Sequence, residues 1–184
     1  IAVHPQPAPS AVDPWPGDAA EAPALIALFS RGDLLSARAS EVLATRGAAA
    51  VRDLVAALTS DIAEVRQYAA RTLGAIATGE PALDALVRRL SDEVWEVRWD
   101  AEEAIVRFGS AGIEAVLEEL THAAPDARFN QAVLHVLERA PMDMWETLKP
   151  VVQTLRSGDS ALSAPIAAAK AIQTLRRAEP AAVG

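Results

Sequence analysis

Residues 61–109 read DIAEVRQYAARTLGAIATGEPALDALVRRLSDEVWEVRWDAEEAIVRFG and contain one pattern twice. Glu64-Val65-Arg66 returns as Glu96-Val97-Arg98 after 32 residues, and Ala69 returns as Ala101. A helical hairpin of this length cannot bury its apolar face alone, and hairpins that recur at such a period stack on one another. The stretch therefore predicts an all-α solenoid.

Apolar residues outside this stretch extend the repeat in both directions. Residues 20–33 resemble residues 79–92 and predict the second helix of a truncated first repeat. The spacing i, i+3, i+4, i+7 places side chains on one face of a helix. It occurs in Val51, Leu54, Val55 and Leu58, in Leu83, Leu86, Val87 and Leu90, and in Ile113, Val116, Leu117 and Leu120. We expect a right-handed α-solenoid of about five hairpins, or about ten helices, over residues 19–178.

The repeat weakens toward the C-terminus. After Leu120 the match decays, and a helix expected over roughly residues 144–155 contains Pro150. Proline lacks an N–H and clashes with the preceding turn, so it should kink or split this helix. Terminal repeats often depart from the consensus because they cap the core.

The two ends of the chain are expected to lie outside the solenoid. Residues 1–18 contain five prolines and should run extended, either as a linker or as a strap on a partner or on the solenoid edge. Trp15 is apolar for a free tail, so it is a candidate contact residue. Residues 179–184 are expected to form a C-terminal tail. The chain starts with Ile1 rather than Met, which fits a trimmed, processed or fragmentary chain.

Composition excludes several function classes. The net charge of −8 argues against binding to nucleic acid or to an anionic membrane surface, since both need a positive protein surface. No apolar run approaches the roughly 18 residues of a membrane span, so we expect a soluble protein without membrane insertion. The absence of cysteine excludes disulfides and thiolate chemistry. It leaves the compartment undecided, with the cytoplasm slightly favoured and a removed signal peptide also compatible.

The residues give no positive support for catalysis. The sequence contains no glycine-rich phosphate loop, no nucleophile elbow and no paired-histidine zinc motif. His122 and His135 lie on separate elements without a second ligand at metal spacing. We therefore expect a non-enzymatic protein without a metal, a cofactor or a small-molecule ligand.

Trp95 and Trp99 are the most unusual feature of the repeats. They lie four residues apart on one helical face, among acidic residues that include Glu96 and Asp100. Ala63 and Gln67 occupy the matching positions 32 residues earlier, so the repeat itself does not require tryptophan. Two interpretations remain open: the indoles pack against the neighbouring hairpin, or they are exposed anchors for a partner protein.

The second helices of the repeats suggest another surface. Opposite their buried stripes they carry small and charged residues, namely Asp53, Ala56, Ala85, Arg88, Ala115 and Glu118. Such a groove can accept a helix or an extended segment of a partner. The change from basic Arg88 and Arg89 to acidic Glu118 could orient that segment. A solvated charged face explains the pattern equally well.

The repeats resemble short HEAT-like repeats of the type found in phycobilisome lyases and many bacterial proteins. The matching residues are Asp61, Val65-Arg66, Ala69-Ala70, Leu73-Gly74 and Ile76, then Val97-Arg98, Ala101, Ala104-Ile105 and Gly109. The resemblance covers residues 20–140 clearly and 141–177 weakly. It implies that Arg66 and Arg98 belong to a ladder of polar contacts between repeats. Ser36 stands where the first repeat should carry this arginine, so the ladder is expected to start at the second repeat.

The resemblance implies binding rather than catalysis, because this module is used mostly for interactions. Our first hypothesis is a protein-interaction module, either a scaffold or an accessory subunit of a larger complex. A bilin lyase or a tetrapyrrole-binding chaperone, with the tryptophans as a chromophore shelf, is an alternative that rests on the resemblance alone. A regulatory domain of a longer chain is a third hypothesis.

Overall fold

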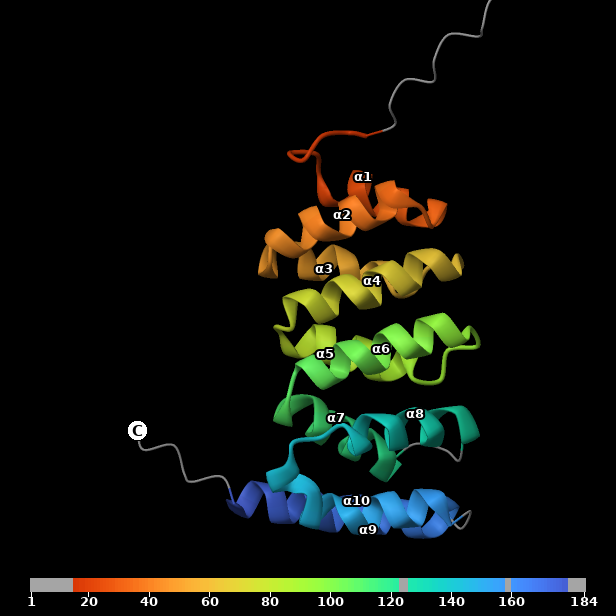
Figure 1. Cartoon of the computed structure of the whole chain (residues 1–184), viewed down its shortest axis with the longest axis vertical. Coiled ribbons are helices and arrows are strands. Elements are labelled where there is room, and N and C mark those ends of the chain that lie inside the picture. Colours follow the sequence, from red (N-terminus) through yellow and green to blue (C-terminus); the bar gives the residue numbers. More distant parts are fainter. Residues whose placement is uncertain (1–14, 123–125, 158–159, 179–184) are drawn as a thin grey trace, which may run out of the picture.

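The computed structural model describes residues 15–122, 126–157 and 160–178. Within these residues the chain forms helices and no strand, which confirms the expected all-α class and about ten helices (Figure 1). The elements are α1 (Ala22–Ile26), the 3-10 helix η1 (Ala27–Arg31), α2 (Leu34–Thr45), α3 (Ala48–Ala57), α4 (Ala63–Ile76), α5 (Glu80–Arg89), α6 (Trp95–Arg107), α7 (Ser110–His122), α8 (Ala127–Glu138), the 3-10 helix η2 (Met142–Met144), α9 (Trp145–Arg156) and α10 (Ser160–Ala178).

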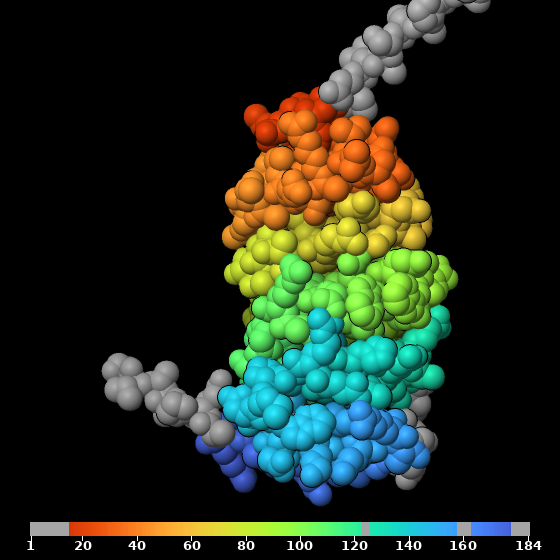
Figure 2. All heavy atoms as spheres, in the orientation of Figure 1, coloured from red at the N-terminus to blue at the C-terminus, as the bar shows by residue number. Residues whose placement is uncertain are grey.

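The helices stack as rungs along the long axis of the molecule, from α1 and α2 at one end to α9 and α10 at the other (Figure 1). One layer contains α2, α4, α6 and α8, and the other contains α1, α3, α5 and α7, each packed on its neighbours in that layer. Across the layers α3 packs on α4 and α5 on α6. The most closely packed pairs are therefore the second helix of one predicted repeat and the first helix of the next. On the face shown in Figure 2, successive pairs form one continuous column.

The last pair reverses the order of the layers. A regular continuation would place α9 on α7 and α10 on α8. Instead, α9 packs on α8, and α10 packs on α7 and α9. The chain thus stays in one layer from α8 to α9 and crosses to the other layer only at α10. This reversal accounts for the weak repeat pattern after Leu120.

The core consists of the predicted apolar stripes. All four members of the stripes at 83–90 and 113–120 are buried, as are Leu54 and Leu58 in the first copy. Alanines and one glycine allow the helices to approach closely. A Cβ placed on Gly74 of α4 would lie 2.7 Å from the Cα of Ala104 on α6. Glycine is required at this crossing because the backbones meet there.

Two turns show how the repeats are joined. Gly47 and Gly109 precede α3 and α7 with φ values of 57° and 61°, a conformation that favours glycine. The corresponding turn after α4 is one residue longer, and Ala77 adopts a φ of 44° there. This turn contains the extra residues of the second repeat.

The expectation that Pro150 splits its helix is wrong. Helix α9 runs from Trp145 to Arg156 with Pro150 inside it. Proline removes only one backbone donor, and the Thr154 hydroxyl donates to the Pro150 carbonyl oxygen at 2.8 Å. Packing on both α8 and α10 supports the helix as a whole.

Candidate protein-binding surfaces

Trp95 and Trp99 are exposed at the start of α6. Trp95 begins the helix, and the two residues are 57% and 43% exposed. Their rings stack on each other with centroids 5.5 Å apart and an interplanar angle of 23°. The interpretation that they fill the core is therefore wrong. Burial of Val97, Ala101 and Ile105 on the opposite side of α6 leaves the two indoles on its outward face.

The two predicted acidic neighbours of the tryptophans differ in their surroundings. Glu96 is exposed. Asp100 is buried, and Arg71 of α4 donates to both of its carboxylate oxygens at 3.3 and 3.2 Å. Asp100 is consequently occupied within the fold, because it joins α4 to α6.

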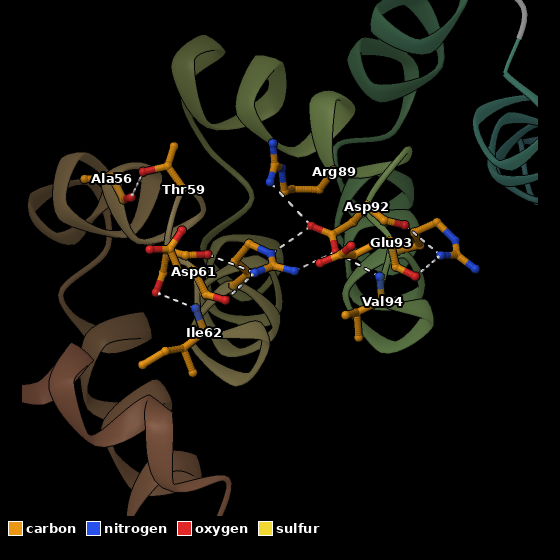
Figure 3. Close-up of polar contacts among 11 residues, drawn as sticks. Ala56, Thr59, Asp61, Ile62, Arg89, Asp92, Glu93 and Val94 are labelled. Carbon is orange, nitrogen blue, oxygen red and sulfur yellow. Dashed lines mark hydrogen bonds and ion pairs between the residues drawn. The ribbon is translucent and has the colours of Figure 1, made fainter.

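Arg66 and Asp92 form the first step of the expected polar ladder (Figure 3). The Arg66 guanidinium donates to both carboxylate oxygens of Asp92 at 2.8 and 2.9 Å, and to the backbone carbonyls of Ser60 and Asp61 at 2.9 and 3.2 Å. Burial alone would raise the pKa of Asp92, but the hydrogen bond and charge of Arg66 and the Val94 N–H lower it below its ordinary value. A bidentate buried pair of this kind fixes orientation as well as charge.

The ladder repeats, and it starts where the sequence predicts. Arg98 donates to the carbonyls of Asp92 and Glu93 at 2.7 and 3.1 Å, which are the positions 32 residues after Ser60 and Asp61. In the first repeat the buried Ser36 donates to the carbonyl of Leu28 at 2.7 Å. The serine satisfies the carbonyl that corresponds to that of Ser60 without introducing a buried charge.

Arg88 and Arg89 diverge, although they are adjacent in sequence. Arg89 belongs to the ladder, since its guanidinium lies 3.4 Å from Asp92 (Figure 3). Arg88 is exposed and lines a groove over α5, α7 and α10. The expectation that both arginines face one groove is therefore wrong for Arg89, because its side chain turns toward the buried carboxylate.

This C-terminal groove encloses about 720 Å³. Glu118 and Ala115 line it together with Arg88, as the sequence predicts, and Arg176 of α10 closes one side. Arg176 forms ion pairs with Glu114, at 3.8 Å, and with Glu118. Glu118 is thus already paired within the chain. A second, more apolar groove of about 520 Å³ contains the predicted Asp53 and Ala56 near α1, whereas the predicted Ala85 is buried.

Trp15 lies at the N-terminal end of the stack, far along the chain from the other tryptophans. The Arg38 guanidinium lies 4.2 Å from its ring centroid, and its indole N–H donates to Asp18 at 3.1 Å. Arg46 donates to the carbonyls of Asp18 and Ala20, both at 2.6 Å. These contacts hold residues 15–20 against α2. The rest of the predicted Pro-rich segment, and the predicted tail at 179–184, lie outside the described residues.

Glu102 is a residue that the motif search missed. It is buried on α6, at the position that Ala70 occupies in α4 and Ala132 in α8. Its Oε2 lies 3.4 Å from Nδ1 of His135 on α8, and among the described residues this oxygen has no hydrogen-bond partner. Burial raises the pKa of Glu102 despite the opposing charge of His135. A carboxylate in an alanine position of the repeat was the available signal.

The candidate residues therefore occupy four separate places rather than one site. Trp95, Trp99 and Glu96 lie on the outward face of α6, and Arg88 and Glu118 lie in the C-terminal groove. Within the described residues, no group of three or more histidines and carboxylates could hold a metal ion. None of the helices described is long and apolar enough to cross a bilayer.

Comparison with known families agrees with this architecture. A family model described as HEAT repeats matches residues 18–106, which span α1 and nearly all of α6. Comparisons with curated proteins and with solved structures gave no match. The narrower likeness to phycobilisome lyases, and the pigment chemistry that it implies, stay predictions. The paired helices, the ladder of arginines and the matched segment together place the chain, through residues 18–106, in the HEAT repeat family.

Proposed function

We propose that this chain is a non-catalytic protein-binding module, a scaffold or an accessory subunit, that captures a partner protein on the outward face of α6. Trp95 and Trp99 are the anchors of this surface. The observation that carries the proposal is their exposure as a stacked pair. HEAT repeats typically serve protein interactions, which favours binding over catalysis.

The energetics of tryptophan support this choice of surface. The fold does not need either indole, since Ala63 and Gln67 occupy the same positions in α4. Two stacked indoles form a large, rigid apolar surface, and removing such a surface from water on binding is favourable. Tryptophan is also strongly enriched among the residues that dominate the binding energy of protein interfaces. A partner that covers both rings would gain this energy at little cost in side-chain entropy.

The experiment that tests the proposal compares two double variants as baits in an extract of the source cells. Trp95→Ala with Trp99→Ala removes the proposed anchors. Leu34→Ala with Met142→Ala is the matched control, because both residues are large, apolar and more than four-fifths exposed elsewhere on the molecule (88% and 86%). Circular dichroism should show equal helicity for both variants and the wild type.

The expected result is that the wild type and the control variant retain the same partner, and that the tryptophan variant loses it. Retention of that partner by the tryptophan variant would overturn the proposal. Equal loss from both variants would also overturn it, because the binding would then follow general surface hydrophobicity.

A further inference from the structure

We infer that the partner presents an arginine side chain to the stacked rings of Trp95 and Trp99 and to the carboxylate of Glu96. This inference rests on the proposed function and names the chemistry of the partner. It follows from how the chain treats its other accessible aromatic rings, and from which charges near α6 are already neutralised.

Two other aromatic rings each carry a guanidinium supplied by the chain itself. Arg38 lies over Trp15 at 4.2 Å from the ring centroid, and Arg71 lies over Tyr68 at 5.2 Å. Both rings are partly exposed. The negative face of an aromatic ring attracts a cation, and arginine is the cation found most often in this position.

The tryptophan pair lacks such a cation. Among the described residues, no guanidinium or ammonium group lies over the ring of Trp95 or Trp99. The nearest arginines in sequence and in the adjacent helix are committed elsewhere. Arg98 donates to the backbone carbonyls of Asp92 and Glu93, and Arg71 is bound to Asp100.

The charges around the pair also favour a cationic partner. Three acidic residues on or before α6 are neutralised within the chain, namely Asp92 by Arg66, Asp100 by Arg71 and Glu103 by Arg139. Glu96 is exposed, and among the described residues it has no ion-pair partner. It is adjacent to Trp95 and one helical turn before Trp99. An arginine that covers the rings can therefore also pair with Glu96.

A display selection tests the inference and separates it from the proposed function. A random-peptide library is panned against the immobilised chain and depleted on the Trp95→Ala, Trp99→Ala variant. We expect the peptides that depend on the tryptophans to be enriched in arginine over the unselected library. Tryptophan-dependent peptides without this enrichment would overturn the inference and leave the proposed function standing. Failure to recover any tryptophan-dependent peptide would count against both.

A synthetic pair of peptides then isolates the charge. The best selected peptide is compared with a version in which citrulline, which has nearly the same shape but no charge, replaces the arginine. We expect citrulline to weaken binding roughly five- to thirty-fold, the range expected for loss of a partly desolvated cation–π contact. Glu96→Gln should weaken only the arginine peptide, and Glu119→Gln, which removes an exposed carboxylate from α7, should weaken neither. Equal affinity for both peptides would overturn the inference.

Discussion

Arg66 of α4 holds Asp92, which precedes α6, through two N–H···O hydrogen bonds of 2.8 and 2.9 Å. Only 8% and 3% of the two side chains are exposed. The same guanidinium also satisfies two carbonyls in the turn before its own helix. Asp92 in turn accepts from the Val94 N–H at 3.1 Å. This one pair therefore joins two successive repeats and organises the turns at both of their ends.

Removing Arg66 should strongly destabilise the protein. Arg66→Ala leaves the Asp92 carboxylate buried without its cation, and we expect a loss of about 3–5 kcal/mol in the free energy of unfolding. Urea denaturation followed by circular dichroism measures this loss. Arg52→Ala is the control, since Arg52 is exposed and pairs only with Asp53, and it should cost about 1 kcal/mol or less. Similar small effects for both variants would contradict a stabilising role for the pair.

The Arg66–Asp92 pair also predicts how stability depends on pH. The pKa of Asp92 is lowered from 3.8, so the folded state keeps the carboxylate charged where the unfolded chain binds a proton. The resulting stability is present above the unfolded value and is lost as the pH falls through the folded pKa. We expect the wild type to exceed Asp92→Asn in stability at neutral pH, and the difference to shrink below about pH 4. Urea titrations across this range measure it, and a constant difference would speak against the assignment.

Glu102 should have the opposite effect. Burial raises its pKa from 4.5, so the stability that its protonated form provides is lost as the pH rises through the folded value. Glu102→Ala restores the residue found at positions 70 and 132. It should stabilise the protein by about 1–3 kcal/mol at pH 8, and by less as the pH approaches 4.5.

The neighbouring carboxylate provides the control for this experiment. The hydrogen bond from Arg139 lowers the pKa of Glu103. Glu103→Gln should therefore destabilise the protein at neutral pH, and this loss should fade in acid. If the two variants showed the same pH trend, the buried environment of Glu102 would not be the cause.

Gly74→Ala should force α4 and α6 apart. The added methyl group would lie 2.7 Å from backbone and side-chain atoms of Ala104, and a rigid helix cannot yield there as a flexible side chain could. We expect a loss of about 1–3 kcal/mol, as for overpacked cores, although alanine has the higher helix propensity. Thermal unfolding measures the change. A gain in stability would mean that the crossing is looser than the structure indicates.

Ala77→Gly should stabilise the protein. Ala77 ends α4 in the left-handed region with φ of 44°, and its N–H donates to the Leu73 carbonyl. Glycine adopts this conformation without the steric penalty of a Cβ atom, so we expect a gain of about 0.5–1 kcal/mol. The same substitution at Ala69, a buried position inside α4, should instead destabilise the protein. Equal effects at both positions would exclude a conformational origin.

Periodicity was enough to predict the helices and their buried faces. The stripe from Leu83 to Leu90 is a local property, because the helical period alone decides which side chains share a face. The ladder arginine and its replacement by Ser36 were also predictable, since they recur at a fixed separation along the chain. The family match over residues 18–106 agrees with this reading.

The details that periodicity missed depend on contacts between helices. Arg89 faces Asp92 rather than the groove because a carboxylate two turns of chain away lies beside it in space. Asp100 is occupied by an arginine from α4, which no pattern within α6 could reveal. Exposure of Trp95 and Trp99 was left open for the same reason, since it depends on what the adjacent rungs place beside them.

The reversed order of α9 and α10 has a consequence for how this molecule comes apart. In the ladder, Arg66 and Asp92 are separated by 26 residues, whereas Arg176 of α10 meets Glu118 of α7 across 58 residues. Closing the longer loop requires α8 and α9 to be in place, and each contact of α10 is repaid only after that ordering. A regular array can fray one hairpin at a time. Here, release of α10 uncovers α7 and α9 together, so the four C-terminal helices unfold as one cooperative block.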